Sequence, residues 1–232
     1  MTDAIDIIYE DNHLLGILKP AGLLVQGDRT GDPTALDLAK SYLKQTYAKP
    51  GNVFLGLVHR IDRPVSGVVL FARTSKAASR LARAFHDRKV EKSYLAVVTG
   101  SVSANADELV GYVERAHLKS RVAPEPSPTA KEARLTYSVL ARRSRTTLLE
   151  VTPRTGRHHQ IRVQLAGIGH PVVGDIKYGA PERLDDGSVA LHSARLALDH
   201  PVGGNRVSLS APPPLENAPW WTHRATIEGY FL

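Results

Sequence analysis

Residues 57–73 constrain the fold of this chain more than any other stretch. They read LVHRIDRPVSGVVLFAR, in which a charged segment, 59–63, lies between two apolar runs. Pro64 and Gly67, two turn-forming residues, separate the charged segment from the apolar run 68–71. Short apolar runs bounded by turn residues are typical of buried strands. We therefore expect a strand, a polar loop and a second strand here.

The loop carries one carboxylate, Asp62, with His59, Arg60 and Arg63 close to it in sequence. Cationic neighbours favour the ionised form of a carboxylate. An ionised carboxylate can act as a nucleophile or a base, and it is less suited to donating a proton at neutral pH. A surface loop with a salt bridge would have the same composition, because structural ion pairs also arise from such sequences. This segment alone leaves both interpretations open.

Length and composition favour one globular domain covering residues 1–232. The chain has 42% hydrophobic residues, and no apolar run approaches the roughly 20 residues that a transmembrane helix needs. The acidic N-terminus lacks the basic and apolar regions of a signal peptide. The absence of cysteine excludes disulfides, zinc thiolates and a cysteine nucleophile. We therefore expect a cytoplasmic protein without a membrane segment.

The charge pattern favours a polyanionic partner. The net charge is +7, and two stretches are strongly cationic. In residues 73–92 the charged residues are Arg73, Lys76, Arg80, Arg83, Arg88, Lys89 and Lys92 against Asp87 and Glu91. In residues 142–162 they are Arg142, Arg143, Arg145, Arg154, Arg157 and Arg162 against Glu150. A solvated face usually mixes both signs, so we expect these stretches to face phosphates.

Periodicity predicts a mixture of strands and helices. We expect a hairpin at 5–9 and 13–18, and a helix that begins at Asp32-Pro33, with Asp32 as the N-cap. We expect a second helix at 76–88, capped by Ser75, and a third over 155–169 in which His158 and Arg162 share a face. The buried stripe of the third helix would be Ile161, Leu165 and Ile168. Further strands are predicted at 91–100, 133–141, 146–152, 189–199 and 206–209. Residues 101–131 are interpreted as a short strand pair with a mobile connection.

Several common catalytic motifs are missing from the sequence. It contains no P-loop, no Rossmann glycine pattern at a strand–helix junction and no Gly-x-Ser-x-Gly elbow. The spacing of the histidines fits no zinc pattern, and a basic surround repels cations. We therefore expect no metal site.

Three motifs in a fixed order carry a resemblance to a known family. They are HRIDRPVSGVVLFA from residue 59, EKSYLAVVTG at 91–100 and TGRHHQIRVQLAGIGHPVVGDIKYG at 155–179. This combination resembles the RluA-type family of RNA pseudouridine synthases. The flanks LKPAGLLVQ and LHSARLALDHP agree with it, so the resemblance covers nearly the whole chain.

The resemblance implies a fold and an activity. The fold would be α+β, with a mixed, mostly antiparallel sheet, peripheral helices and a central basic cleft. The activity would be the isomerisation of uridine to pseudouridine in tRNA or rRNA, without a cofactor. The catalytic region begins almost at once, so we expect no N-terminal S4 domain. We expect a monomer that binds an RNA stem-loop with a flipped uridine.

The resemblance also implies roles for single residues. Asp62 matches the essential aspartate, Tyr94 the tyrosine that packs on the target base, and Arg162 the basic residue that pairs with the aspartate. A flipped base needs a stacking surface, which an aromatic side chain supplies. The candidate substrate-binding residues are His59, Arg60, Arg63, Lys92, Arg157, His158, Gln160 and Leu191.

Two other functions compete with isomerisation. An RNA-binding or RNA-folding protein could keep the same cleft without turnover, although the three catalytic residue types are all present. A nucleoside hydrolase-like enzyme could use Asp62 on a glycosidic bond, although it would more naturally show paired carboxylates.

Overall fold

The computed structural model describes residues 5–117 and 119–232. Contacts divide the chain into two compact units. Unit 1 comprises the described part of Met1–Glu91 together with Ser193–Ala211, and unit 2 comprises Lys92–His192 and Pro212–Leu232. Each unit has its own set of antiparallel strands.

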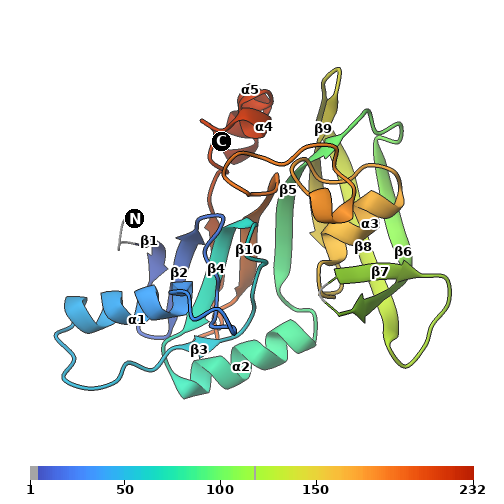
Figure 1. Ribbon diagram of the computed structural model, residues 1–232. Helices are drawn as coiled ribbons and strands as arrows, with labels where there is room; N and C mark the ends of the chain where they lie inside the picture. The colour runs from blue at the N-terminus through green and yellow to red at the C-terminus, as the bar shows by residue number, and fades with distance from the viewer. Residues whose placement is uncertain (1–4, 118) are drawn as a thin grey trace. The chain divides into compact units, whose positions relative to one another are not determined.

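Unit 1 is built on four neighbouring strands (Figure 1). Their order is β1 (Asp6–Glu10), β2 (Leu14–Lys19), β4 (Ser66–Ala72) and β10 (Leu191–Asp199), which enters unit 1 at Ser193. Two further strands, β3 (Gly56–Leu57) and β11 (Arg206–Ser210), pair antiparallel with β4 and β10. The predicted hairpin and the strand after the charged loop are confirmed. The apolar run before that loop forms only the two-residue β3.

The two helices of unit 1 begin at threonine caps that the sequence analysis did not choose. α1 (Ala35–Thr46) starts after Thr34, whose hydroxyl accepts from the Asp37 amide while the Asp37 carboxylate accepts from the Thr34 amide. This capping box satisfies two backbone donors at once, so it defines the helix start better than Asp32 does. α2 (Ser75–His86) starts after Thr74, whose hydroxyl accepts from the Ala77 amide. The predicted caps, Asp32 and Ser75, were therefore wrong.

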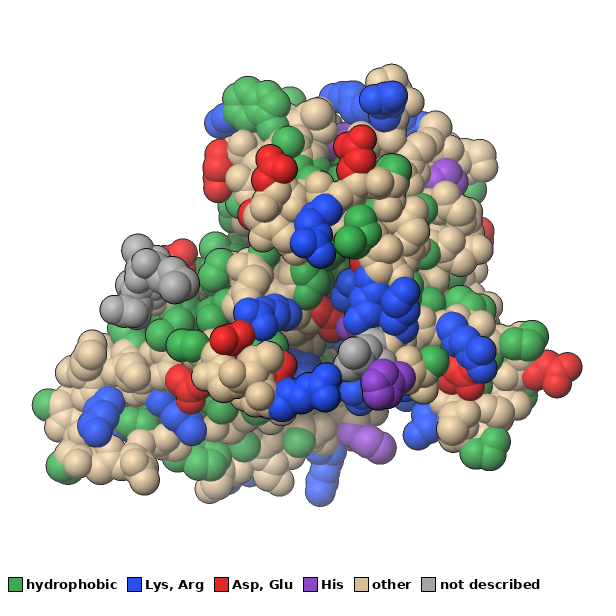
Figure 2. All heavy atoms as spheres, viewed as in Figure 1, with side chains coloured by type: hydrophobic (Ala, Val, Ile, Leu, Met, Phe, Trp, Pro, Cys, Tyr) green, Lys and Arg blue, Asp and Glu red, His purple; other side chains and the backbone are tan. Residues whose placement is uncertain are grey.

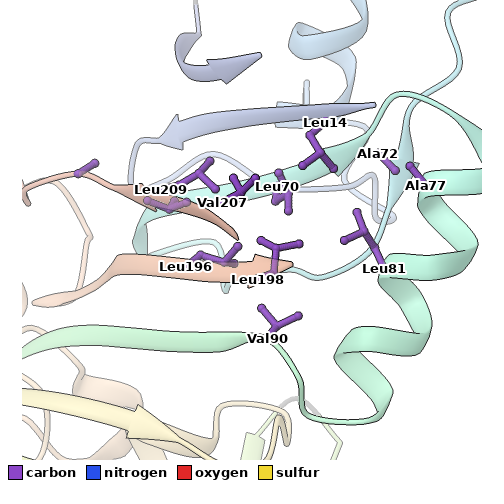
Figure 3. Close-up of a cluster of buried hydrophobic side chains, with 12 residues drawn as sticks. Leu14, Leu70, Ala72, Ala77, Leu81, Val90, Leu196, Leu198, Val207 and Leu209 are labelled. Atoms are coloured by element: carbon purple, nitrogen blue, oxygen red, sulfur yellow. The ribbon is translucent and has the colours of Figure 1, made fainter. Parts of the chain in front are cut away.

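A continuous apolar cluster holds α2 against the strands of unit 1 (Figure 3). Leu70 of β4 and Leu81 of α2 lie in it with Leu198 of β10, and all three side chains are buried. The labelled side chains come from β2, β4, α2, β10 and β11, with Val90 from the segment after α2, so residues far apart in sequence share one core. Burying apolar surface contributes about 25 cal/mol per Å². This core fixes both ends of the loop that carries Asp62.

Unit 2 is a second antiparallel arrangement (Figure 1). Its strand order is β5 (Glu91–Thr99), β9 (Thr146–Pro153), β8 (Ala130–Arg142), β6 (Ala106–Ala116) and β7 (Lys119–Ala123). The strand pair predicted within 101–131 is confirmed, because β6 pairs with β7 as well as with β8. Two short helices, α4 (Ala218–Trp221) and α5 (Arg224–Phe231), end the chain. The mobile connection predicted within residues 101–131 stays a prediction.

The helix predicted over 155–169 is shorter than expected. α3 spans Gln160–Gly167, because its N-cap, His159, has a left-handed backbone with φ 53°. His158 therefore lies before the helix. The prediction that His158 and Arg162 share a helical face was wrong. Ile168 follows the helix end and is 38% exposed, so it does not belong to the buried stripe.

Two glutamine bonds and a small apolar cluster hold α3 on unit 2. Gln164 donates from Nε2 to the carbonyls of Leu109 and Ala133, at 3.1 and 3.2 Å. Val163 packs with Val113 and Ala133. A 3-10 turn, η1 (Ile176–Tyr178), follows α3 in the chain.

The architecture is α+β with mostly antiparallel strand pairing, as predicted from the resemblance. Of the helices in the described part of the chain, none combines the length and apolarity that crossing a bilayer requires. The single domain over 1–232 and the basic cleft stay predictions.

Gly67 gives a direct test of how closely β4 and β10 approach. Its φ is +123°, and an added Cβ would lie 2.4 Å from the Ser193 carbonyl oxygen. We expect Gly67→Ala to lower the free energy of unfolding by about 3 kcal/mol or more, because overlap with backbone adds to strain. Urea unfolding measures it.

Gly203→Ala is the matched control. Gly203 also has a positive φ, +107°, but a Cβ there would meet nothing within 4 Å. It should lose only the conformational penalty, about 1–2 kcal/mol. Equal losses in the two variants would show that the contact with Ser193 is unimportant.

Candidate active site

In unit 1, the loop between β3 and β4 carries Asp62, which is partly buried. The Asp62 carbonyl accepts a hydrogen bond from the Val65 amide at 3.1 Å, which closes a tight turn. His59 accepts from the Leu70 amide through Nε2 at 2.9 Å, and its ring stacks on Phe85 at 4.9 Å. These contacts attach the loop to β4 and α2, so His59 orders the loop. Its predicted contact with substrate stays a prediction.

A buried lysine, which the sequence analysis did not select, lies next to this loop. Lys19 is fully buried at the end of β2. Its Nζ donates to the carbonyls of Pro20 and Leu23 at 2.8 Å each, and to that of Arg63 at 3.3 Å. An ammonium has three N–H donors, so these three oxygens match its protonated form.

Opposing effects act on this ammonium. Burial has the largest effect and lowers the pKa of Lys19, the nearby Asp62 carboxylate raises it, and Arg63 lowers it. The resulting pKa is about 7. The turn Lys19-Pro20-Ala21-Gly22 belongs to the flank LKPAGLLVQ, which agrees with the family resemblance. In the structure it surrounds a cation beside the proposed catalytic carboxylate.

The two arginines of the loop differ in their contacts. Arg63 donates from Nε to the Gly22 carbonyl at 2.9 Å and pairs with Asp32 at 2.8 Å. Arg63 therefore ties the loop to the turn after β2 and remains about half exposed. Arg60 is exposed to solvent. Both stay candidates for substrate binding.

In unit 2, β5 carries Lys92 and Tyr94 on the same face, since alternate residues of a strand point the same way. Both are partly buried, and burial lowers the pKa of Lys92. The intervening Ser93 donates to Glu150 at 2.7 Å, and Tyr230 of α5 donates to the same carboxylate at 2.5 Å. The C-terminal helix thus fixes the strand that presents Tyr94.

Arg162 lies on α3 with its side chain only 5% exposed. Its Nε donates to Asp175 Oδ2 at 2.6 Å and its Nη2 donates to Asp175 Oδ1 at 2.8 Å. This bidentate ion pair lies within unit 2 and was not predicted from the sequence. The predicted pairing of Arg162 with Asp62 stays a prediction.

A ring network continues from Arg162. The guanidinium lies over the Tyr178 ring, with its Cζ 5.1 Å from the ring centroid. The Tyr178 hydroxyl lies 2.7 Å from His159 Nδ1 and accepts from the Ser120 amide at 2.9 Å. His158 stacks on His159 at 3.7 Å and contacts the buried hydroxyl of Ser120 at 2.9 Å.

Three other predicted substrate-binding residues support the protein backbone or core. Gln160 is buried, with Oε1 accepting from Thr155 at 2.7 Å and from the Arg157 amide at 3.0 Å. Arg157 donates from Nε to the Glu132 carbonyl at 2.8 Å. Leu191 is 3% exposed at the start of β10. The bonds of Gln160 and Arg157 hold the segment before α3. Substrate binding by any of the three residues stays a prediction.

The two cationic stretches are used differently. In unit 2, Arg142 donates to the carbonyls of Val102 and Ser103, and Arg143 to that of Thr222. These arginines therefore support loops and the C-terminal segment. On the face shown in Figure 2, Lys and Arg side chains lie at separate places, several of them with an acidic side chain close by.

The basic face of α2 is the exception. Lys76, Arg80 and Arg83 of α2 are exposed to solvent, and the turn just after the helix adds the exposed cations Arg88 and Lys89. Of these, Arg80 also donates to the Pro201 carbonyl at 2.5 Å. We call these five residues the α2 basic face.

Comparison with known proteins decides the family. A family model described as RNA pseudouridylate synthase matches residues 13–167, which include Asp62, Tyr94 and Arg162. The chain belongs to this family. The resemblance expected from the three motifs is confirmed.

Individual relatives agree with this assignment. "Ribosomal large subunit pseudouridine synthase D" of Xylella fastidiosa is 37% identical over 90% of this chain and 66% of its own length, so the chain spans just under two thirds of that relative. "Dual-specificity RNA pseudouridine synthase RluA" of Pasteurella multocida is 35% identical over 90% of this chain and 93% of its own length.

Solved structures confirm the fold. The structure of "Human RNA Pseudouridylate Synthase Domain Containing 4" matches with a TM-score of 0.80 at 24% identity, covering 96% of this chain and 93% of that one. At this identity the likeness speaks for the fold alone.

Lys19 predicts a pH dependence of stability. Its pKa falls from 10.5 in the unfolded chain to about 7 in the folded protein, so the unfolded state binds more protons between these values. Stability contributed by this group therefore rises with pH. Between pH 6.5 and 8.5 we expect the free energy of unfolding to rise by about 2 kcal/mol more in the wild type than in Lys19→Met.

Urea unfolding at several pH values measures this difference. Lys44→Met is a control, because Lys44 is exposed on α1. It should follow the wild-type curve. Parallel curves for the wild type and Lys19→Met would contradict a lowered pKa of Lys19 in the folded protein.

Proposed function

We propose that this protein is an RNA pseudouridine synthase, an isomerase that converts uridine to pseudouridine within tRNA or rRNA. The supporting observation is the family match across residues 13–167, a range that contains the three proposed catalytic residues. The names of the two relatives describe action on the ribosomal large subunit and dual specificity toward RNA. Action as a monomer in the cytoplasm is part of the proposal.

The reaction rearranges bonds without net oxidation. The N1–C1′ bond of uridine breaks, the base rotates, and C5 forms a new bond to C1′. C5 loses its proton and N1 gains one, so the product is an isomer of the substrate. No oxidant, reductant or cofactor is required by this balance.

Each proposed catalytic residue has a task in this scheme. Asp62 would attack C1′ as a nucleophile or remove the C2′ proton as a base, and both roles need the ionised carboxylate. Tyr94 would stack on the flipped base and accept the C5 proton. Arg162 would pair with Asp62 and favour its ionised form. Asp62 and Tyr94 are both partly buried.

The α2 basic face is our candidate for phosphate binding. Three of its cations lie on α2, whose other side packs in the core of unit 1, and two lie in the turn that follows the helix. Phosphate contacts position a nucleic acid without reading its sequence. Such a face would hold the RNA while the loop with Asp62 acts on one nucleotide.

The activity is tested with RNA that carries tritium at uridine C5. We expect the wild type to release tritium without free uracil, and Asp62→Asn to release none above background, since the amide is neither nucleophile nor base. Asp6→Asn, at an exposed position of β1, is the control and should match the wild type. Tight RNA binding without release would indicate a silent RNA-binding protein, and free uracil would indicate a hydrolase.

The α2 basic face is tested with the double variant Arg83→Gln and Arg88→Gln. We expect weaker RNA binding, a salt dependence whose log–log slope falls by roughly 1 for each lost phosphate contact, and unchanged turnover at saturating RNA. Filter binding at several salt concentrations measures the first two. Lys44→Gln on α1 is the matched control, and unchanged affinity in the double variant would remove α2 from the RNA site.

A further inference from the structure

A tight turn between α3 and β10 holds the Arg162 side chain. Asp175 begins this turn, and its amide donates to the Val172 carbonyl at 3.0 Å. Its own carbonyl accepts from the amides of Tyr178 and Ala180, at 2.9 and 3.1 Å. Gly174 precedes it with φ +85°, and an added Cβ there would lie 2.8 Å from the Ser188 carbonyl oxygen. The turn therefore has one backbone conformation.

The carboxylate of Asp175 fixes the plane of the guanidinium. The two parallel hydrogen bonds use Nε and Nη2 of Arg162, at 2.6 and 2.8 Å. A bidentate pair determines direction as well as distance, which a single contact does not. Both side chains are almost fully buried, at 5% and 1% exposure, so water does not compete for these bonds.

Tyr178 supports the same guanidinium through its ring. The ring lies under Cζ of Arg162 at 5.1 Å, in the geometry of a cation–π contact. Its hydroxyl is held from two directions, by the Ser120 amide of β7 and by His159 Nδ1 before α3. These bonds fix the position of the hydroxyl end of the ring.

We infer that Asp175 and Tyr178 are positioning residues that hold Arg162 in the orientation needed for the reaction. This inference deepens the proposed function and rests on it. Neither residue would touch the substrate. Both act through the guanidinium, whose misplacement by about 1 Å can lower a rate about 100-fold.

Asp175→Asn is the first test, since the amide keeps the size of the side chain but loses the charge. We expect the single-turnover rate at saturating RNA to fall about 30- to 100-fold, with RNA affinity within about 3-fold of the wild type. Asp185→Asn, at an exposed position of the following loop, should match the wild type in both quantities. A folded Asp175→Asn variant with wild-type turnover would overturn the inference.

A second pair of variants separates the two contacts of Tyr178. Tyr178→Phe keeps the ring over the guanidinium and removes the hydroxyl bonds, whereas Tyr178→Leu removes both. We expect a smaller loss of turnover in the first variant than in the second, with RNA affinity unchanged in each. Equal, wild-type turnover in both would exclude a role for Tyr178. This pair also keeps the inference testable if Asp175→Asn fails to fold.

A measurement without substrate separates this inference from the proposed function. In a ¹⁵N-labelled protein, the Nε–H signal of Arg162 is assigned by its loss in Arg162→Lys. We expect this hydrogen to exchange slowly with solvent in the wild type and at least about 10-fold faster in Asp175→Asn, because the carboxylate bond protects it. Fast exchange in the wild type would overturn the inference. Absence of turnover in the wild type would instead contradict the proposed function.

Discussion

Among the described residues, each unit buries one Lys or Arg side chain, and the oxygen atoms that surround it determine the local structure. A buried charge is tolerated only when hydrogen bonds or a counter-charge replace the lost water. Unit 1 surrounds Lys19 with three backbone carbonyls, one of them from Arg63 in the loop that carries Asp62. Unit 2 pairs Arg162 with the carboxylate of Asp175. The turn after β2 and the turn after α3 have the shapes that these two cations require.

The sequence predicted the strands better than it predicted the ends of helices. Strands follow from alternation and from apolar runs, which are local, and β1, β2, β4 and β5 formed where expected. A helix starts at the residue whose side chain bonds the free backbone amides of the first turn, and several nearby residues can do this. Thr34 and Asp37 form these bonds in α1, and Asp32 is not the cap. α3 begins late because His159 adopts a left-handed backbone conformation, which cannot be predicted from the residue type.

The candidate site was predictable only as far as its motifs extend. Asp62, Tyr94 and Arg162 stand in recognisable motifs, and the family match covers all three. Asp175 and Lys19 were missed, because burial and pairing arise from tertiary contacts that spacing along the chain does not encode. The cationic stretches illustrate the same limit. Arg142 and Arg143 donate to backbone carbonyls, whereas Arg83 on α2 and Arg88 in the turn after it are exposed, although both runs look alike in sequence.

His159 has a left-handed backbone, with φ 53°, and its side chain supports a neighbouring residue. A side chain in this conformation costs about 1 kcal/mol relative to glycine, so glycine would relieve the strain. The imidazole that glycine removes is the group that contacts the Tyr178 hydroxyl. Substitution by glycine would therefore relieve the backbone strain but remove a contact that holds Tyr178 under Arg162. Screens for thermostable forms of this protein need to select for catalysis in the same round.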